Sequence, residues 1–209
     1  GDDGDEEDKD EGGATTEAAA FELSDQAAKA VGSRIDAVKT EIGPGGRRHQ
    51  PIIVVASLID KAPNLGGLAR TCEIFAAECL VVHDLAIKKD AIFKAVSVSA
   101  SEWMPLVEVK PPAIARFLRA KRAEGFTVVG LEQAARSQEL GKVELPEKVI
   151  LVLGKEKEGI PVELIQELDI VVEIPQLGVI RSLNVHVSGA MLVWEYTRQR
   201  LARHVHSAE

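Results

Sequence analysis

The chain has 209 residues, which is the size of one domain or of one domain with extensions. Hydrophobic residues make up 45% of it, enough to form a core, and this excludes a wholly disordered protein. A net charge of −8 would ordinarily argue against nucleic-acid binding, but the charge is uneven. Residues 1–11 hold eight acids and one base, whereas the other 198 residues hold 25 acids and 24 bases. The acidity therefore belongs to the first residues, and the rest of the chain is nearly neutral.

The lengths of the apolar runs and the pattern of cysteines indicate the kind of compartment in which the protein acts. The runs IIVVAS and VILVLG fall far short of the roughly 18 residues of a membrane span, and no apolar leader opens the chain, so we expect no membrane association. Cys72 and Cys79 belong to no CxxC pair or Cys/His cluster, which predicts free, partly buried thiols and no metal site. A reducing compartment follows, cytoplasmic or nuclear. An organelle is left open because the first residue is Gly1 rather than Met.

The first 48 residues are predicted to lie outside the main domain. Residues 1–14 are acidic and rich in glycine, which predicts a disordered tail. Residues 15–48 read as a helical extension and linker, with a helix from Ser24 to about Ile42 that ends at the glycines of residues 43–46. This helix could dock on a partner or cover its own domain, and we favour the second interpretation.

From residue 49 onward the pattern predicts strands alternating with helices. The strands are rich in Val, Ile and Leu without alternation, which is typical of a parallel sheet buried on both faces. They are expected at 51–58, 79–83, 106–110, 127–132, 149–154 and 170–175. Helices are expected at 65–77, 90–97, 111–125, 162–168 and 182–203. We expect the last helix to pack through an apolar face of Leu183, Val187, Ala190, Met191, Trp194 and Leu201. The prediction is therefore an α/β domain over 49–209, with a mostly parallel sheet between helices.

Glycine-rich turns with polar residues follow three of these strands. After the first strand, Asn64 could cap the next helix, and Gly66 and Gly67 allow backbone or ligand to approach closely. Further turns follow at residues 154–161 and 175–184. Because ligands bind at the carboxyl ends of strands in such sheets, these turns are the candidate site. The P-loop and GxGxxG motifs are absent, as are HExxH and GxSxG. His83 and His186 stand singly, and we interpret them as structural.

The three turns together resemble a known family. The patterns are NxGxxxR from Asn64 to Arg70, LVLGxExxGI from Leu151 to Ile160, and IPQxGxxxSLNV from Ile174 to Val185. They are similar to the three motifs of the SpoU/TrmH branch of the SPOUT RNA 2′-O-methyltransferases. The sequence around them, including ASLIDK and RSLNVHVSGA, resembles the C-terminal domain of the eukaryotic TAR RNA-binding protein 1 group.

The resemblance implies a trefoil-knotted fold, a homodimer and S-adenosyl-L-methionine as methyl donor, without a metal. The implied cofactor-binding residues are Leu131, Glu132, Leu153, Gly154, Gly159, Ile174, Pro175, Ser182, Leu183 and Asn184. The implied catalytic residues are Arg70, Asn64, Glu156, Ser182 and Asn184. Arg70 would clamp a phosphate and stabilise the developing alkoxide, since a guanidinium is a poor general base. Asn64 and Glu156 would fix Arg70 and the RNA. The alternatives are a surface salt bridge for Arg70 and a helix cap for Asn64.

The resemblance also implies RNA as the partner, with tRNA and its D-loop guanosine 18 favoured and no DNA expected. Candidate phosphate-binding groups fall in four clusters of basic residues: Lys88, Lys89 and Lys94; Arg116, Arg119, Lys121 and Arg122; Arg47 and Arg48; and Arg198, Arg200 and Arg203. We expect the last helix, with Trp194 and Tyr196, to form part of a dimer interface. The alternatives are a non-catalytic RNA-binding module with the same fold and another α/β nucleotide enzyme.

Overall fold

The computed structural model describes residues 41–42, 46–180 and 182–206. The predicted tail over 1–14 and the predicted helix from Ser24 as far as residue 40 lie outside the described residues. The statements that follow concern the described part of the chain.

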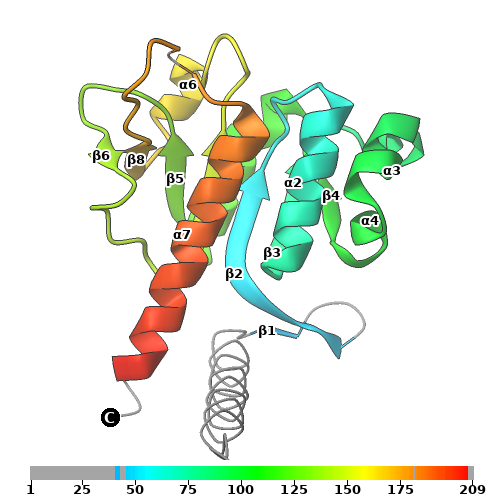
Figure 1. Cartoon of the computed structure of the whole chain (residues 1–209), viewed down its shortest axis with the longest axis horizontal. Coiled ribbons are helices and arrows are strands. Elements are labelled where there is room, and N and C mark those ends of the chain that lie inside the picture. The colour runs from blue at the N-terminus through cyan, green and yellow to red at the C-terminus, as the bar shows by residue number, and fades with distance from the viewer. Residues whose placement is uncertain (1–40, 43–45, 181, 207–209) are drawn as a thin grey trace, which may run out of the picture. The chain divides into compact units, whose positions relative to one another are not determined.

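Strands and helices alternate along the chain (Figure 1). The strands are β1 (Glu41–Ile42), β2 (Arg48–Val55), β3 (Ala77–Val82), β4 (Leu106–Glu108), β5 (Thr127–Leu131), β6 (Gln138–Glu139), β7 (Val149–Leu153) and β8 (Ile170–Glu173). The α-helices are α2 (Ala62–Ile74), α3 (Ala91–Ser97), α4 (Ala100–Trp103), α5 (Ile114–Ala123), α6 (Val162–Ile165) and α7 (Val185–His206). The short 3-10 helices η2 (Leu85–Lys89) and η3 (Pro111–Ala113) precede α3 and α5.

The sheet has the strand order β4-β3-β2-β7-β5-β8-β6, and all of these pairs are parallel. β1 pairs antiparallel with the start of β2. The central strand β7 is buried along its whole length, as its run of Val, Ile and Leu predicts for a strand covered on both faces. Because the strands are parallel, their carboxyl ends meet at one edge of the sheet, and the three predicted turns follow β2, β7 and β8 there.

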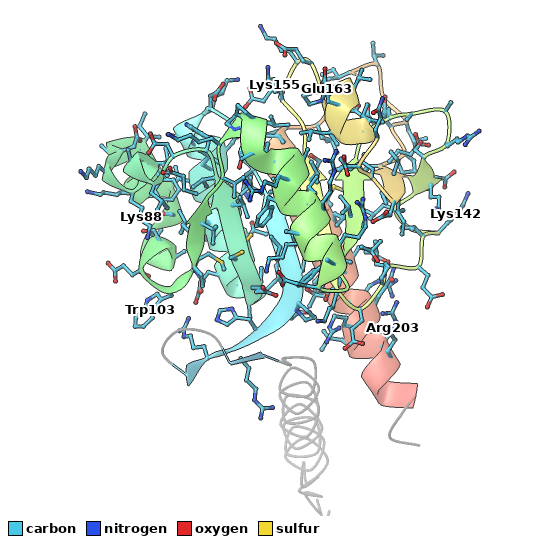
Figure 2. The ribbon with its side chains drawn as sticks, turned by 180° about the vertical axis from the view of Figure 1, so that it is seen from behind. Lys88, Trp103, Lys142, Lys155, Glu163 and Arg203 are labelled. Atoms are coloured by element: carbon cyan, nitrogen blue, oxygen red, sulfur yellow. The ribbon has the colours of Figure 1, made fainter. Side chains whose placement is uncertain are left out.

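Two apolar cores lie on opposite faces of the sheet. One core packs Leu65, Leu68 and Tyr196 of α2 and α7 on strand residues such as Val54. The other packs Ile114, Leu118 and Leu164 of α5 and α6 on the alternate residues of the same strands. Figure 1 shows α7 and α2 in front of the sheet, and Figure 2, from behind, shows α5 across the opposite face. The predicted α/β fold with a mostly parallel sheet between helices is confirmed, while the trefoil knot stays a prediction.

The predicted helix ending at Ile42 is wrong at its last two residues. Glu41 and Ile42 form β1, whose partners in β2 are His49 and Arg48. Strand pairing therefore begins before the predicted domain boundary at residue 49. The helical period of Val31, Ile35, Val38 and Ile42 carries no information about a hairpin, because β1 depends on backbone pairing with β2.

The predicted packing face of the last helix is also wrong. Val187, Met191 and Trp194 of that face are exposed by 44%, 39% and 48%, and Leu183, which precedes the helix, is exposed by 43%. The residues that pack on the sheet are instead Val185, Leu192, Val193 and Tyr196. α7 carries apolar residues on two sides, so a period of 3.6 does not tell which side meets the sheet.

The cysteines are buried and free, as the sequence predicts. Burial raises the pKa of the Cys79 thiol to about 12, and it raises the pKa of Cys72 further. Neither thiol is therefore a reactive nucleophile at neutral pH. None of the helices in the described ranges is long and apolar enough to cross a membrane.

Candidate active site

A cavity of about 220 Å³ lies at the carboxyl ends of β7, β5 and β8, which are neighbours in the sheet. This is the place where ligands bind in open α/β sheets. Its wall combines apolar side chains with charged, amide and hydroxyl groups. The lining residues are Leu131, Glu132, Gln133, Leu153, Gly154, Lys155, Glu156, Lys157, Gly159, Val172, Glu173, Ile174, Gln176, Ser182, Leu183, Val185 and Ser188.

Most of the predicted cofactor-binding residues line this one cavity. They are Leu131, Glu132, Leu153, Gly154, Gly159, Ile174, Ser182 and Leu183. Pro175 and Asn184 belong to the same loops but do not line the cavity. Among the other lining residues, Lys155, Lys157, Gln176 and Val185 lie in the predicted turns and motifs but were not assigned to the cofactor. Gln133, Val172, Glu173 and Ser188 were missed, because their residue types carry no signal of a site.

The turn after β7 requires glycine at two positions. A Cβ atom on Gly154 would lie 2.4 Å from the backbone carbon of Gly159, and one on Gly159 would lie 2.2 Å from a carboxylate oxygen of Glu132. Gly159 also has a φ of +70°, which side chains disfavour. Glu132 closes the turn by accepting a hydrogen bond from the backbone N–H of Ile160 at 2.9 Å. The Glu132 carboxylate therefore shapes the cavity wall.

One polar network joins the three motif segments. The carboxylate of Glu156 accepts a hydrogen bond from the side-chain amide of Asn64 on α2. The Asn64 oxygen accepts a bond of 2.9 Å from the side-chain amide of Asn184, which precedes α7. Asn184 also caps α7, because its oxygen accepts a bond of 2.9 Å from the backbone N–H of His186. Three segments distant in sequence are thus held together beside the cavity.

Two local predictions for these segments need correction. Lys61, not Asn64, is the N-cap residue of α2, and Asn64 lies in the first helical turn with its side chain buried. The start of α2 lies three residues earlier than predicted because Pro63 is accepted in a first helical turn. The last helix begins at Val185 rather than Ser182, since Asn184 supplies the cap.

Gly66 and Gly67 allow helices, rather than a ligand, to approach α2. A Cβ atom on Gly66 would lie 3.0 Å from the carbonyl oxygen of Phe93 in α3. A Cβ atom on Gly67 would lie 2.4 Å from the ring of His186 in α7, and the other ring nitrogen of His186 is 3.1 Å from the Thr71 hydroxyl. Burial lowers the pKa of His186, which favours its neutral form. His186 is therefore a packing residue between α2 and α7, in agreement with its structural interpretation.

Arg70 is exposed and is not fixed by Asn64 or Glu156. The described part of the chain contains no hydrogen bond or ion pair of Arg70, so neither Asn64 nor Glu156 bonds it directly. Arg70 lies six positions after Asn64, which turns the two side chains to different faces of α2. Within the described ranges Arg70 also lacks the salt bridge that was its alternative role. Its guanidinium is thus available to bind an anion.

Lys61 is a member of the network that sequence reasoning missed. Its ammonium group pairs with the second carboxylate oxygen of Glu156. No group of three or more His, Cys, Asp or Glu residues that could hold a metal ion occurs within the described ranges.

Comparison with known proteins identifies the family. A family model described as the SpoU rRNA Methylase family matches residues 51–194, more than half of the chain. The chain belongs to this family. The match spans all three motifs.

The protein tRNA (guanosine(18)-2'-O)-methyltransferase TARBP1 of Mus musculus is 59% identical over 156 residues, which are 75% of this chain and 10% of the mouse protein. The TrmH/SpoU tRNA modifying enzyme of A. aeolicus has a TM-score of 0.67 at 23% identity, covering 86% of both chains. The AdoMet-bound rRNA methyltransferase of Sinorhizobium meliloti has a TM-score of 0.62 at 22% identity, covering 79% of this chain and 59% of that one. These two likenesses establish that the chain shares the fold of both enzymes.

Replacing Gly154 by alanine tests the geometry of the cavity wall. We expect Gly154→Ala to lower the free energy of unfolding by about 1–3 kcal/mol, because the new methyl group overlaps the backbone at Gly159. Gly178→Ala is the matched control, since a Cβ atom there meets nothing within 4 Å. Urea denaturation followed by circular dichroism compares the two. Equal stability of both variants would show that the turn after β7 is wrongly described.

Proposed function

We propose that this domain is an S-adenosylmethionine-dependent RNA ribose 2′-O-methyltransferase that acts on guanosine 18 of tRNA. The observation that supports this best is the junction of all three family motifs, through Glu156, Asn64 and Asn184, at the edge of one cavity. The stated activity of the 59%-identical mouse protein supports the choice of tRNA and nucleotide. The chain spans only 10% of that protein, so the proposal is made for the domain.

The cavity suits an adenosyl group with a charged amino-acid end. Leu131, Leu153 and Ile174 offer apolar surface for the faces of an adenine ring, and Gly154 and Gly159 also line the cavity. Among the lining residues, Glu173 offers a negative charge for the ammonium of the ligand and Lys155 a positive charge for its carboxylate. When bound, S-adenosylmethionine would supply an electrophilic methyl group on a sulfonium sulfur. The S. meliloti relative was crystallised with this cofactor, which supports the same proposal.

Arg70 is the residue of the chain that we assign to the ribose. Methylation of a 2′-hydroxyl requires an oriented oxygen, stabilisation of its developing negative charge and an acceptor for its proton. The free guanidinium of Arg70 can hold the adjacent phosphate and stabilise the oxygen, while that phosphate accepts the proton. Asn64 and Asn184 hold the motif segments in place, and Ser182 lies on the cavity wall.

Only some of the predicted basic clusters are free to contact RNA. Arg119, Lys121 and Arg122 pair with Glu167, Glu124 and Asp169, and Arg47 pairs with Glu73. Arg198 and Arg203 also have acidic partners. By contrast, the described part of the chain shows no ion pair for Lys88, Lys89, Lys94 or Arg116. Figure 2 shows Lys88 projecting outward. These four residues are the best-supported contacts to RNA phosphates within the described ranges.

Substitution of Arg70 tests the proposed chemistry. Incubation with labelled S-adenosylmethionine and unmodified tRNA, followed by nucleoside mapping, should place the label on the ribose of guanosine 18. Arg70→Ala should reduce the rate by about 100-fold or more, because it removes stabilisation of the transition state. The affinity for S-adenosylhomocysteine should stay unchanged. Lys142→Ala, which removes an exposed lysine with no assigned role in RNA binding or catalysis, should retain most of the rate. Label on a base, or no label on any RNA, would refute the proposal and favour a non-catalytic RNA-binding module.

We further propose that two copies of the domain form a dimer through the outer faces of α2 and α7. Ile74, Val187, Met191 and Trp194 expose apolar side chains there, with Ile74 exposed by 66%. The ring of Trp194 lies 5.7 Å from that of Phe75, which joins the two helices into one surface. Arg70 shares a helical face with Ile74, four residues on, so a partner on this surface would lie next to the proposed catalytic arginine. Tyr196, also predicted at the interface, is instead buried against Glu147.

Charge insertion tests this interface. Sedimentation velocity at micromolar concentration should show a dimer for the unaltered chain and a monomer for Trp194→Glu, because a buried unpaired carboxylate opposes association. Val162→Glu is the matched control, because Val162 is exposed by 67% on α6, away from this face, and it should leave the dimer intact. A monomeric unaltered chain, or a dimer that survives Trp194→Glu, would contradict the proposed interface.

A further inference from the structure

Lys61 lies at the point where the network of motif residues reaches solvent. It is the N-cap residue of α2, and its ammonium group pairs with Glu156. The Lys61 side chain is exposed by 66% and that of Glu156 by 23%. One oxygen of Glu156 accepts the Asn64 amide and the other accepts Lys61, so both ends of the carboxylate are engaged. Neither Lys61 nor its partnership with Glu156 was apparent from motif spacing.

The loop before α2 and the turn after β7 carry complementary charges. Lys61 pairs with Glu156, and the preceding residue Asp60 acts electrostatically on Lys155, the residue before Glu156. The hydrogen bond and charge of Glu158 raise the pKa of Lys155 more strongly than Asp60 does. The pairing therefore fixes how the two strand-end segments face each other.

The negative charge of a carboxylate at this position opposes the binding of RNA. Glu156 lines the cavity and holds Asn64, which belongs to the same helix as Arg70, the group that we assign to the ribose and its phosphate. Left alone, its negative charge would repel a phosphodiester, because like charges brought together at an interface oppose binding. The ammonium of Lys61 supplies the opposite charge on the side of Glu156 that faces solvent.

We propose that Lys61 is a positioning residue for the methyl transfer, which neutralises and orients Glu156 so that RNA can approach the Asn64–Asn184 pair. This inference rests on the proposed function and deepens it. Lys61 acts through Glu156 and makes no contact of its own with RNA. The competing role is a direct contact of Lys61 with a phosphate, and the two roles differ in whether the effect of Lys61 depends on Glu156.

A double-mutant cycle separates these roles. The affinity for an unmodified tRNA transcript is measured by fluorescence anisotropy for the unaltered chain, Lys61→Met, Glu156→Gln and the double variant. Lys61→Met alone should weaken binding on the order of tenfold, because it leaves Glu156 uncompensated beside the phosphates. In the Glu156→Gln background the same change should have no effect. Lys61→Arg should restore the affinity, and Lys142→Met, which alters an exposed lysine outside the cavity lining, should leave it unchanged.

Two further readouts exclude a merely structural role. The affinity for S-adenosylhomocysteine, measured by calorimetry, and the midpoint of thermal unfolding should be the same for Lys61→Met and the unaltered chain. In the methyl-transfer assay, KM for tRNA should rise on the order of tenfold in Lys61→Met, in line with the weaker binding. A loss of affinity that persists with Glu156→Gln would overturn the proposal in favour of direct phosphate contact.

The outcomes also distinguish this inference from the proposed function. If the unaltered chain methylates tRNA and Lys61→Met binds tRNA as well as the unaltered chain does, only the role of Lys61 is overturned. An unaltered chain that binds tRNA and shows the predicted cycle without transferring methyl groups would overturn the catalytic proposal alone. A failure of the unaltered chain to bind tRNA would overturn both.

Discussion

The side chain of Glu156 is the constraint on which the arrangement of the site depends. It accepts hydrogen bonds from Asn64 and Lys61, and through Asn64 it is linked to Asn184, the cap of α7. One half-buried carboxylate therefore fixes the relative positions of the turn after β7, the start of α2 and the start of α7. A buried acceptor that loses a donor costs more free energy than the bond contributes, so each link of this network depends on the others.

The side chains that hold the site together are distinct from the cation that stays available to bind an anion. Asn64, Glu156 and Asn184 bond to one another, whereas Arg70 projects from another face of the same helix with no partner in the described ranges. Within α2, Gly66 and Gly67 bring α3 and α7 close, and this packing holds the backbone that carries Arg70. A rigid helix thus presents a free cation next to an exposed apolar surface. This combination suits a site that is completed by a second copy of the chain and by RNA.

The sequence was sufficient for the alternation of the main strands and helices along the chain and for the turns that form the site, because buried parallel strands and glycine-rich strand ends leave local signals. The sequence was insufficient for features that depend on tertiary contacts, namely the packing side of α7 and the roles of individual side chains. Which apolar side of α7 meets the sheet depends on packing, so the expected apolar face with Met191 and Trp194 is exposed rather than packed on the sheet. Asn64 is a residue type that often caps helices. In the structure, however, α2 begins at Ala62, and the Asn64 amide donates a hydrogen bond to Glu156. The role of Lys61 depends on a partner 95 residues away, which no local pattern reveals.

We propose that the carboxyl ends of β5, β7 and β8 form the cofactor site beside the network of Glu156. A crystal structure of the chain with S-adenosylhomocysteine would show whether they do. We expect the adenosine to lie among Leu131, Leu153, Gly154 and Ile174, with the Asn64–Glu156–Asn184 contacts intact. Binding of the ligand elsewhere on the domain, or a broken contact between Asn64 and Glu156 in the complex, would contradict it.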